Sequence, residues 1–421
     1  MASSMIRLVK IGLVLLLPLL GYSFFVDSEF VEWKADFRRQ AIAAGVRPDI
    51  LDTALRGVVP DHKVLRLDAS QPEYSRAIWD YLDMAASEER VAVGRRLLTE
   101  QAPLLHQVSA QYGVDETYLL AIWGMESSFG YNKGNYAVIR SLATLAAQGR
   151  PERRDFWRGQ LLAALYIVQD GDMALKDLHG SWGGALGHTQ FMPQTLRAHA
   201  VDFDGDGRRD LQNSLADALA STAHYLVESS WKTGLPWGEE VMLPINFAWG
   251  LAEPDNWQTV HYWRNTVGIK PVRGSQLAGA PDTLARVFLP AGYRGPAFLV
   301  YRNFQALLQY NRASSYALGV GLLADRIRGG GVLMAQWPRA MPALSHSEKA
   351  ELQVLLSAVG YSTEGVDGLI GSNTRAALRR WQRDVGFPSD GYATFEQLYL
   401  LRAQTEIRLK TLPSIQEAAA P

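Results

Sequence analysis

Cysteine is absent from the 421-residue sequence. Disulfides, thiolate metal sites and a lipid-modified N-terminus are therefore chemically excluded, and the chain is not expected to be a lipoprotein. The folded state must be stabilised by packing instead. With 48% hydrophobic residues, the chain is long enough to bury a full core and to form about two or three domains.

An excess of charge of either sign is also lacking. The 42 Lys and Arg residues nearly balance the 43 Asp and Glu residues, which leaves a formal net charge of −1. Proteins that hold nucleic acid through its phosphates normally carry a strong basic excess. We therefore expect no nucleic-acid partner.

One long apolar run, IGLVLLLPLLGYSFFV, follows Arg7 and Lys10 near the N-terminus. Basic residues before an apolar run of this length are typical of a signal peptide, and Pro18 inside the run argues against an ordinary buried helix. The sequence has no clean A-x-A cleavage site there, so a retained membrane anchor stays open. We expect residues 1–27 to be a signal peptide or an anchor.

Strand-like alternation is scarce from Glu29 to about Arg328. Apolar residues recur instead at the i, i+3, i+4 spacing of helices, as in WRGQLLAALYIVQD. The best strand candidates are EEVMLPINF and the region from LARVFLP to PAFLVY, where β-branched and aromatic residues cluster between glycines and prolines. The pattern predicts a mainly α fold with a small β-containing subdomain.

A small helical module is expected after residues 329–345, whose three glycines and two prolines mark a linker. The module should span residues 346–403, with Thr374 as the N-cap of its middle helix. The apolar side chains expected inside it are those of Leu352, Leu355, Leu356, Leu378 and Trp381. We interpret the basic run Arg379, Arg380 and Arg383 as a solvated helix face. Residues 404–421 are expected to form a tail, whose last part, SIQEAAAP, has too few large apolar groups to pack and is expected to be disordered.

Glu126 occupies an unusual place for a carboxylate. In YGVDETYLLAIWGMESSFG, Asp115 should cap a helix that runs to about Ser127. Glu126 lies seven residues after Leu119 and four after Ile122, on the apolar stripe of that helix. Burial there would raise its pKa and keep a proton for a leaving-group oxygen, as a glycosidase general acid requires. The alternative is a helix-end glutamate that bends out to solvent.

The segment GSWGGALGHTQFMPQT is rich in glycine. Gly180, Gly183, Gly184 and Gly187 would permit close approach of a ligand, while Ser181 and Gln190 could bind sugar hydroxyls and acetamides. A tight connection between core helices fits the pattern equally well. Five aromatic residues are candidates for stacking on pyranose rings, although each could also belong to the core: Tyr131, Tyr136, Trp182, Tyr225 and Tyr310.

A loop typical of calcium sites follows in VDFDGDGRRDLQNSLADAL. Asp202, Asp204 and Asp206 alternate as in the first half of an EF-hand loop, and Gly207 stands at the sharply turning sixth position. Further ligands would be the backbone carbonyl of Arg208 and the carboxylate of Asp210, directly or through water.

The last position of this loop departs from the EF-hand pattern. Asn213 stands where the bidentate glutamate is expected, so Asp217, one helical turn later, is the favoured closing ligand. We expect a structural Ca²⁺ and no organic cofactor. The alternative is an acidic, solvated turn between residues 202 and 217.

Three of these segments together resemble the B-type lytic murein transglycosylases over about residues 30 to 328. The marks are Glu126-Ser127 in GMESSFG, Gly187 to Pro193 in GHTQFMP, and Tyr310-Asn311 in LLQYNRASSYA. The resemblance implies a lysozyme-like helical catalytic domain at residues 28–328, a similar extended metal loop, and a location in the periplasm or cell envelope. Residues 346–403 resemble a peptidoglycan-binding module of three short helices. The implied partner is the glycan strand of peptidoglycan, and the N-terminus could associate with the membrane; protein partners stay open.

The resemblance also implies roles for single residues. Glu126 would protonate the glycosidic oxygen between N-acetylmuramic acid and N-acetylglucosamine and then accept the proton of the muramyl C6 hydroxyl, which yields a 1,6-anhydro sugar. The residues implied in substrate binding are Ser127, Ser181, Gln190, Tyr225, Tyr310 and Asn311.

Two other functions stay open at this point. A hydrolytic muramidase would need a second carboxylate, for which Asp170 and Asp172 are candidates. A non-catalytic peptidoglycan-binding protein would not need Glu126 on an apolar stripe. A metallopeptidase and a serine hydrolase are disfavoured, because the sequence contains no H-E-x-x-H motif and GSWGG lacks the G-x-S-x-G elbow.

Overall fold

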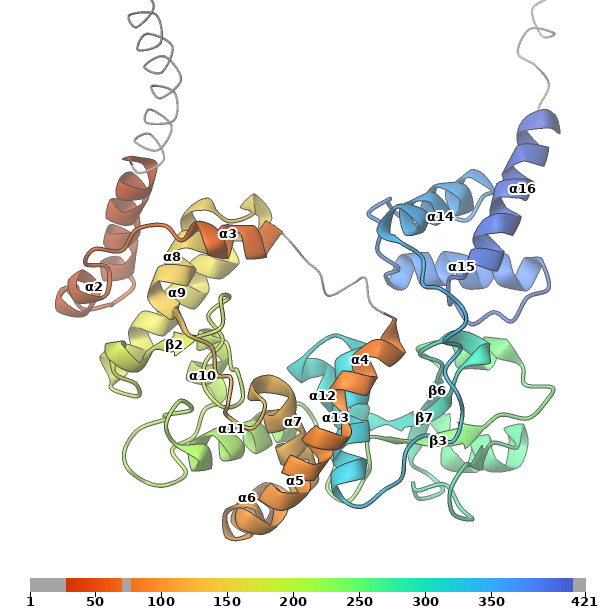
Figure 1. Cartoon of the computed structure of the whole chain (residues 1–421), viewed down its shortest axis with the longest axis horizontal. Helices are drawn as coiled ribbons and strands as arrows, with labels where there is room; N and C mark the ends of the chain where they lie inside the picture. Colours follow the sequence, from red (N-terminus) through yellow and green to blue (C-terminus); the bar gives the residue numbers. More distant parts are fainter. Residues whose placement is uncertain (1–27, 70–76, 412–421) are drawn as a thin grey trace, which may run out of the picture. The chain divides into compact units, whose positions relative to one another are not determined.

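The structure of the chain, a computed structural model, describes residues 28–69 and 77–411 (Figure 1). The predicted signal peptide or anchor at residues 1–27 lies outside these ranges, as do residues 412–421 of the predicted tail. Within the described ranges, no helix has both the length and the apolar character needed to cross a bilayer. The described residues form two compact units, one within residues 1–71 and 122–225 and the other within residues 72–121 and 226–421.

The first unit is mainly helical. Besides a helix at residues 28–43, its helices are α2 (Pro48–Ala54), α3 (His62–Ala69), α8 (Val138–Gln148), α9 (Arg154–Asp170) and α10 (Pro193–His199), with the short helices η2 (Pro151–Arg153) and η3 (Leu175–Asp177). Helices α8 and α9 lie side by side (Figure 1) because Leu142 and Leu145 on α8 and Leu161 and Leu165 on α9 bury their apolar side chains completely. The paired strands β1 (Tyr136–Ala137) and β2 (His179–Gly180) complete this unit.

Two helices contain residues of both units. They are α7 (Glu116–Ser127) and α11 (Leu215–Glu228). The predicted N-cap of α7 is confirmed, since a side-chain oxygen of Asp115 accepts the N–H of Thr117 at 2.9 Å. The predicted helix from Asp115 to Ser127 is therefore present.

A five-stranded antiparallel sheet forms in the second unit, in the order β4-β6-β7-β3-β5. The strands are β3 (Gly238–Met242), β4 (Gln258–Thr259), β5 (Lys270–Pro271), β6 (Leu284–Phe288) and β7 (Ala297–Tyr301). The predicted strands are confirmed at β6, β7 and the first half of EEVMLPINF; the second half leaves the sheet before Pro244. Every residue of the central strand β7 is buried.

Five helices accompany the sheet in the second unit: α4 (Ile78–Ala85), α5 (Glu88–Glu100), α6 (Ala102–Tyr112), α12 (Arg302–Tyr310) and α13 (Ser314–Ile327). The short helices η4 (Trp249–Ala252), η5 (Tyr262–Val267) and η6 (Gly292–Arg294) lie between the strands. Trp263, Val287, Leu299 and Tyr301 form part of one buried cluster under the sheet. The predicted mainly α fold with a small sheet is thus confirmed.

The C-terminal module consists of α14 (His346–Ala358), α15 (Ser372–Asp384) and α16 (Phe395–Thr411). Its predicted core is confirmed: Leu352, Leu356, Leu378 and Trp381 are buried, and Leu355 packs against them. Helix α16 continues to Thr411 and so extends into the segment predicted as a tail.

Two predictions in the module are wrong. Thr374 is not an N-cap, because α15 begins at Ser372; its buried hydroxyl accepts a hydrogen bond from Gln353 Nε2 at 3.0 Å. The basic run is not uniformly solvated either, since Arg379 is buried and its guanidinium lies 3.8 Å from the Glu253 carboxylate. Arg380 and Arg383 are exposed.

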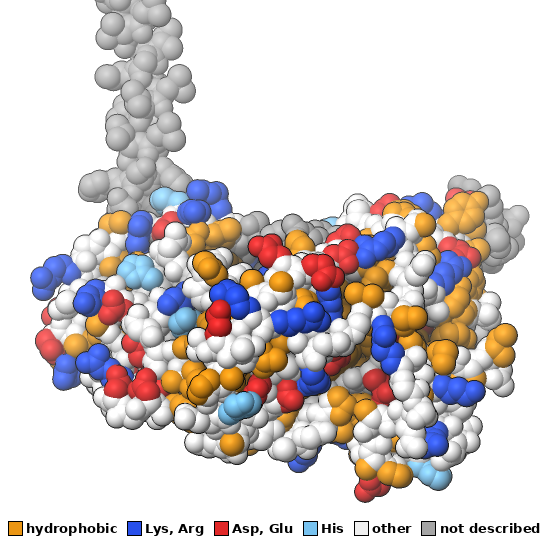
Figure 2. Space-filling view, turned by 60° about the horizontal axis from the view of Figure 1, so that its bottom comes forward, with side chains coloured by type: hydrophobic (Ala, Val, Ile, Leu, Met, Phe, Trp, Pro, Cys, Tyr) orange, Lys and Arg blue, Asp and Glu red, His pale blue; other side chains and the backbone are white. Residues whose placement is uncertain are grey.

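The predicted linker is held against the second unit by hydrogen bonds. Glu240 on β3 accepts the backbone N–H groups of Met334 and Ala335 at 2.9 and 2.7 Å. Arg273 donates to the carbonyl of Val332 at 2.6 Å. On the face drawn in Figure 2, acidic and basic side chains of the described residues lie interspersed.

Candidate active site

Glu126 lies one residue before the end of α7 and is half-buried. The chain reverses directly after this helix, because Ser128 and Phe129 both adopt left-handed backbone angles, with φ of 50° and 59°. The turn brings the Phe129 ring back over α7, edge-on to Trp123 at a centroid distance of 5.7 Å. Glu126 therefore lies beside the tight turn that follows α7.

Ser127, the residue after Glu126, is buried in the first unit. Its side chain is 1% exposed, and its Oγ donates to the carbonyl of His188 at 2.6 Å and accepts the N–H of Gly130 at 2.9 Å. Both functions of the hydroxyl are thus used inside the protein, which argues against the predicted substrate-binding role of Ser127. Ser127 instead connects the end of α7 to the loop that carries Gln190.

That loop, residues 180–193, folds through its own backbone. Leu186 and Phe191 exchange hydrogen bonds at 2.8 and 3.1 Å, and the half-buried Ser181 accepts the N–H of Ala185 on its Oγ at 3.0 Å. A Cβ at Gly187 would lie 2.2 Å from the carbonyl oxygen of Leu211, and one at Gly180 would lie 2.1 Å from that of Ala185. These two glycines make room for the protein's own backbone, which corrects the prediction that they admit a ligand.

Gln190 has a strained backbone and a fixed side chain. Its φ is 52°, and its Nε2 donates to the carbonyls of Gly187 and Lys133 at 2.8 and 3.1 Å. Both amide protons are thereby used, so the Oε1 atom is the group that this half-buried side chain can present as an acceptor. A non-glycine residue held in this conformation is characteristic of functional sites.

His188 is a residue of this loop that the sequence analysis missed. Its Nδ1 lies 3.0 Å from Nε1 of Trp123 on α7. Burial is the main cause that lowers the pKa of His188 to about 4, with the positive charge of Lys133 adding to it. No spacing rule signals such a residue, because the pairing joins positions 65 residues apart.

The aromatic candidates have different surroundings. Tyr225 packs edge-on against Phe191 of the Gln190 loop, with a centroid distance of 5.8 Å. Trp182 is half-buried beside Trp157, whereas Tyr131 is 87% exposed directly after α7. Tyr131 is thus the candidate with the most ring surface open to a sugar.

Tyr310 and Asn311 belong to the second unit, at the end of α12. Tyr310 stacks on Tyr316 with a centroid distance of 6.3 Å and an interplanar angle of 5°. Asn311 is exposed, and its Oδ1 accepts the N–H of Ala313 at 3.0 Å. Tyr136 in the first unit has the Lys63 ammonium 5.3 Å from its ring centroid.

Asp172, a candidate second carboxylate, is committed to an ion pair. It is 5% exposed and accepts hydrogen bonds from Nε and Nη2 of Arg209 at 3.0 and 2.5 Å. Asp170 lies 3.9 Å from the guanidinium of Arg197. Both oxygens of the Asp172 carboxylate are thus already engaged by Arg209, so Asp172 does not fit the role of a hydrolytic base.

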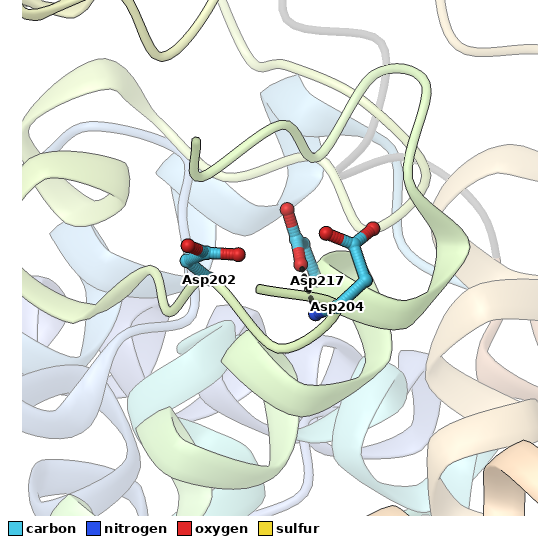
Figure 3. A group of neighbouring side chains, drawn as sticks. All are labelled: Asp202, Asp204 and Asp217. Atoms are coloured by element: carbon cyan, nitrogen blue, oxygen red, sulfur yellow. Dashed lines mark hydrogen bonds between the residues drawn. The ribbon is translucent and has the colours of Figure 1, made fainter. Parts of the chain in front are cut away.

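The metal loop brings three of its predicted ligands together. One carboxylate oxygen from each of Asp202, Asp204 and Asp217 lies within 4.8 Å of the others (Figure 3). Asp217 is buried at the start of α11, and burial, with the neighbouring Asp204 charge, raises its pKa. A hard cation prefers such oxygen ligands and would favour their charged forms.

The other predicted ligands are not part of this group of three carboxylates. The Asp206 carboxylate is exposed and accepts the N–H of Arg208 at 2.9 Å. Since the N–H of Arg208 is used in this bond, its carbonyl is the backbone atom that Arg208 could offer a metal. The Asn213 side chain donates to Asp210 at 2.8 Å. The geometry therefore favours Asp217 over Asn213 as the closing ligand.

Comparisons with known proteins match this chain to two family models and to several relatives. The transglycosylase SLT domain family matches residues 29–325, and the peptidoglycan binding domain family matches residues 345–401. The crystal structure of SltB3 from Pseudomonas aeruginosa, in complex with NAG-anhNAM-pentapeptide, is 49% identical, covers 89% of this chain and 99% of that chain, and has a TM-score of 0.85.

Two further matches, both from Escherichia coli, are less similar. The membrane-bound lytic murein transglycosylase B of strain K12 is 26% identical over 279 residues, which are 66% of this chain and 74% of that protein. The structure of the lytic transglycosylase Slt35 in complex with calcium is 24% identical, covers 70% of this chain and 92% of that chain, and has a TM-score of 0.59.

Proposed function

The chain belongs to the transglycosylase SLT domain family and is a lytic transglycosylase that cleaves the glycosidic bonds of peptidoglycan, and on that premise we propose that Glu126 is its single catalytic acid and base. The observation that carries this proposal is the position of Glu126 in the first unit. Glu126 is half-buried at the end of α7, and the next residue, Ser127, is hydrogen-bonded to the loop that presents Gln190.

The reaction needs one proton carrier used twice. Glu126 gives its proton to the glycosidic oxygen as the bond from C1 of N-acetylmuramic acid breaks, and the N-acetylglucosamine end leaves as an alcohol. The 2-acetamido group of the muramyl residue supports C1 while the bond is open. The C6 oxygen then bonds to C1, and Glu126 takes the C6 hydroxyl proton, which restores the acid and gives the 1,6-anhydro end without consuming water.

Substrate binding is proposed for five residues. Gln190 presents Oε1 to a sugar hydroxyl or amide N–H, and Ser181 lies on the same loop. Tyr225 supports that loop through Phe191. Tyr310 and Asn311 are proposed on the family resemblance alone.

The competing reaction is hydrolysis, in which water attacks C1. The ion pair between Asp172 and Arg209 argues against it, because that carboxylate is not available to activate water. Digesting peptidoglycan in H₂¹⁸O separates the two reactions by mass spectrometry. Anhydro ends free of ¹⁸O support the proposal, whereas reducing ends labelled with ¹⁸O would assign the enzyme to the hydrolases.

A structural calcium ion is proposed at Asp202, Asp204 and Asp217, with Asp206 and the Arg208 carbonyl as further candidate ligands. The carboxylate cluster fits a hard cation, and the Slt35 structure, which shares the fold, was solved in complex with calcium. The ion would supply positive charge to the loop and take no part in bond cleavage.

Export to the cell envelope is proposed from the substrate and from the N-terminal sequence, in which basic residues precede an apolar run. The murein transglycosylase B of E. coli is membrane-bound, and residues 1–27 of this chain are proposed as its signal peptide or inner-membrane anchor. Fractionation of cells that express the full chain tests this: recovery with the periplasm or envelope is expected, and recovery in the cytoplasm would contradict it.

A further inference from the structure

His188 occupies the centre of the contact between the catalytic helix and the Gln190 loop. Trp123 Nε1–H donates to its Nδ1 at 3.0 Å, with the rings edge-on at a centroid distance of 5.6 Å. The backbone of His188 is bound on both sides, since its N–H donates to Leu211 at 2.9 Å and its carbonyl accepts Ser127 Oγ at 2.6 Å. Of these three bonds, only the one to Trp123 depends on the identity of the side chain.

We propose that His188 is a positioning residue: its neutral imidazole, by accepting the Trp123 indole proton, holds the loop that carries Gln190 in register with the end of the helix that carries Glu126. The indole can only donate, so Nδ1 must be unprotonated and the ring proton sits on Nε2. This inference rests on the proposed role of the Glu126 and Gln190 site and adds a residue that sets the site's geometry.

The surroundings of the ring support a single fixed placement. Trp123 is 4% exposed. A Cβ on Gly130 would lie 2.8 Å from His188 Nδ1, so the glycine at this turn, with φ of +87°, leaves room for the imidazole. The charged groups that act on the ring are Lys133, which lowers its pKa, and Asp210, which raises it. Because its pKa is lowered, the imidazole is neutral near pH 7, and Nδ1 can accept the hydrogen bond from Trp123.

Loss of the hydrogen bond between Trp123 and His188 would affect Gln190, two residues further along the chain. Its Nε2 is anchored to the carbonyl of Gly187, the residue directly before His188. A loop that loses the indole bond keeps its backbone bonds but gains freedom at Gly187 and Gln190. Because Gln190 would hold substrate equally before and during bond cleavage, we expect the loss to appear mainly in KM.

The test uses three variants at one position. His188→Phe keeps the ring shape without an acceptor, His188→Asn places an oxygen near the Nδ1 position, and His188→Gln places one near Nε2 instead. We expect His188→Phe and His188→Gln to raise KM about fivefold with kcat within about twofold, which is the size of one lost hydrogen bond. His188→Asn should restore KM to within about twofold of the wild type.

Trp123→Phe removes the donor of this hydrogen bond and so tests the bond from its other partner. Its KM should rise as in His188→Phe, and the double variant should be no worse than either single one, because both remove one interaction. Turnover is measured on a soluble muropeptide with the full-length protein, and the melting temperature of each variant is recorded. Equal KM values for His188→Asn and His188→Phe, or additive losses in the double variant, would overturn the proposal.

A second readout does not depend on catalysis. In ¹H–¹⁵N spectra of indole-labelled protein, the Trp123 signal is the one missing from Trp123→Phe. It should move in His188→Phe and return toward its wild-type position in His188→Asn. If the signal responds in this way but Glu126→Gln remains active, the proposed role of Glu126 is wrong and the hydrogen bond is supported. If the His188 substitutions leave the signal unchanged, the positioning role of His188 is wrong, whatever the activity of Glu126→Gln.

Discussion

Asp172 is the residue on which the choice between two reaction classes depends. The sequence places it just before the GSWGG loop, where a hydrolytic base is conceivable. In the structure it is buried and bonded to both Nε and Nη2 of Arg209. Because a carboxylate held in this way stabilises the fold and does not activate water, Asp172 and Glu126 should respond differently to substitution.

Asp172→Asn tests that difference. The change removes one charge of an ion pair whose carboxylate is buried and whose guanidinium is partly exposed, so a loss of about 2 kcal/mol in the free energy of unfolding is expected. Denaturant unfolding measures this loss. The product at a permissive temperature should still carry anhydro ends, and loss of turnover without loss of stability would instead make Asp172 catalytic.

His188 gives the protein a pH-dependent stability of predictable sign. Burial and Lys133 lower its pKa from 6.5 to about 4. Between these two pH values the unfolded chain binds a proton that the folded protein does not, so stability falls as the pH falls through this window. His188→Phe lacks the group, and its melting temperature should decline less between pH 6.5 and 4. Parallel declines in both proteins would show that His188 is not buried in its neutral form.

Among the elements, α7 shows how far the sequence predicts the site. The helical period and the Asp115 cap predict the helix and the position of Glu126 on it. They do not predict the direction of the Ser127 hydroxyl, because its acceptor is the His188 carbonyl, 61 residues away. The same limit explains the glycines: the sequence shows that close approach is needed at Gly187 but not that the backbone at Leu211 is what approaches.

The metal loop is the element whose closing ligand can be decided by experiment. A cation bound only by the folded protein stabilises it by about 2.7 kcal/mol at a hundred times its Kd. We therefore expect a chelator to lower the melting temperature of the wild type and of Asn213→Ala. It should leave Asp217→Asn unchanged, because that variant lacks the carboxylate beside Asp202 and Asp204. A chelator response in Asp217→Asn equal to the wild type would place the closing ligand elsewhere.

In the molecule as a whole, composition and periodicity predict the broad organisation, and tertiary contacts decide the details. The matched families cover residues 29–325 and 345–401, close to the two segments that the sequence pattern separates. The glycine-rich segment between them is fixed through Glu240 and Arg273. Pairing partners so distant in sequence leave no local signal, which is why the pattern shows only a linker.

The proposed reaction depends on Glu126 as its only proton carrier, and the Glu126→Gln variant tests this role most directly. The substitution keeps the size of the side chain and removes its acid, so the variant should melt as the wild type does and release anhydro-muropeptides from sacculi at about a thousandth of the wild-type rate or less. Mass spectrometry of timed digests, with Asp172→Asn in parallel, gives both rates. More than a few per cent of wild-type release from a folded Glu126→Gln protein would contradict the account.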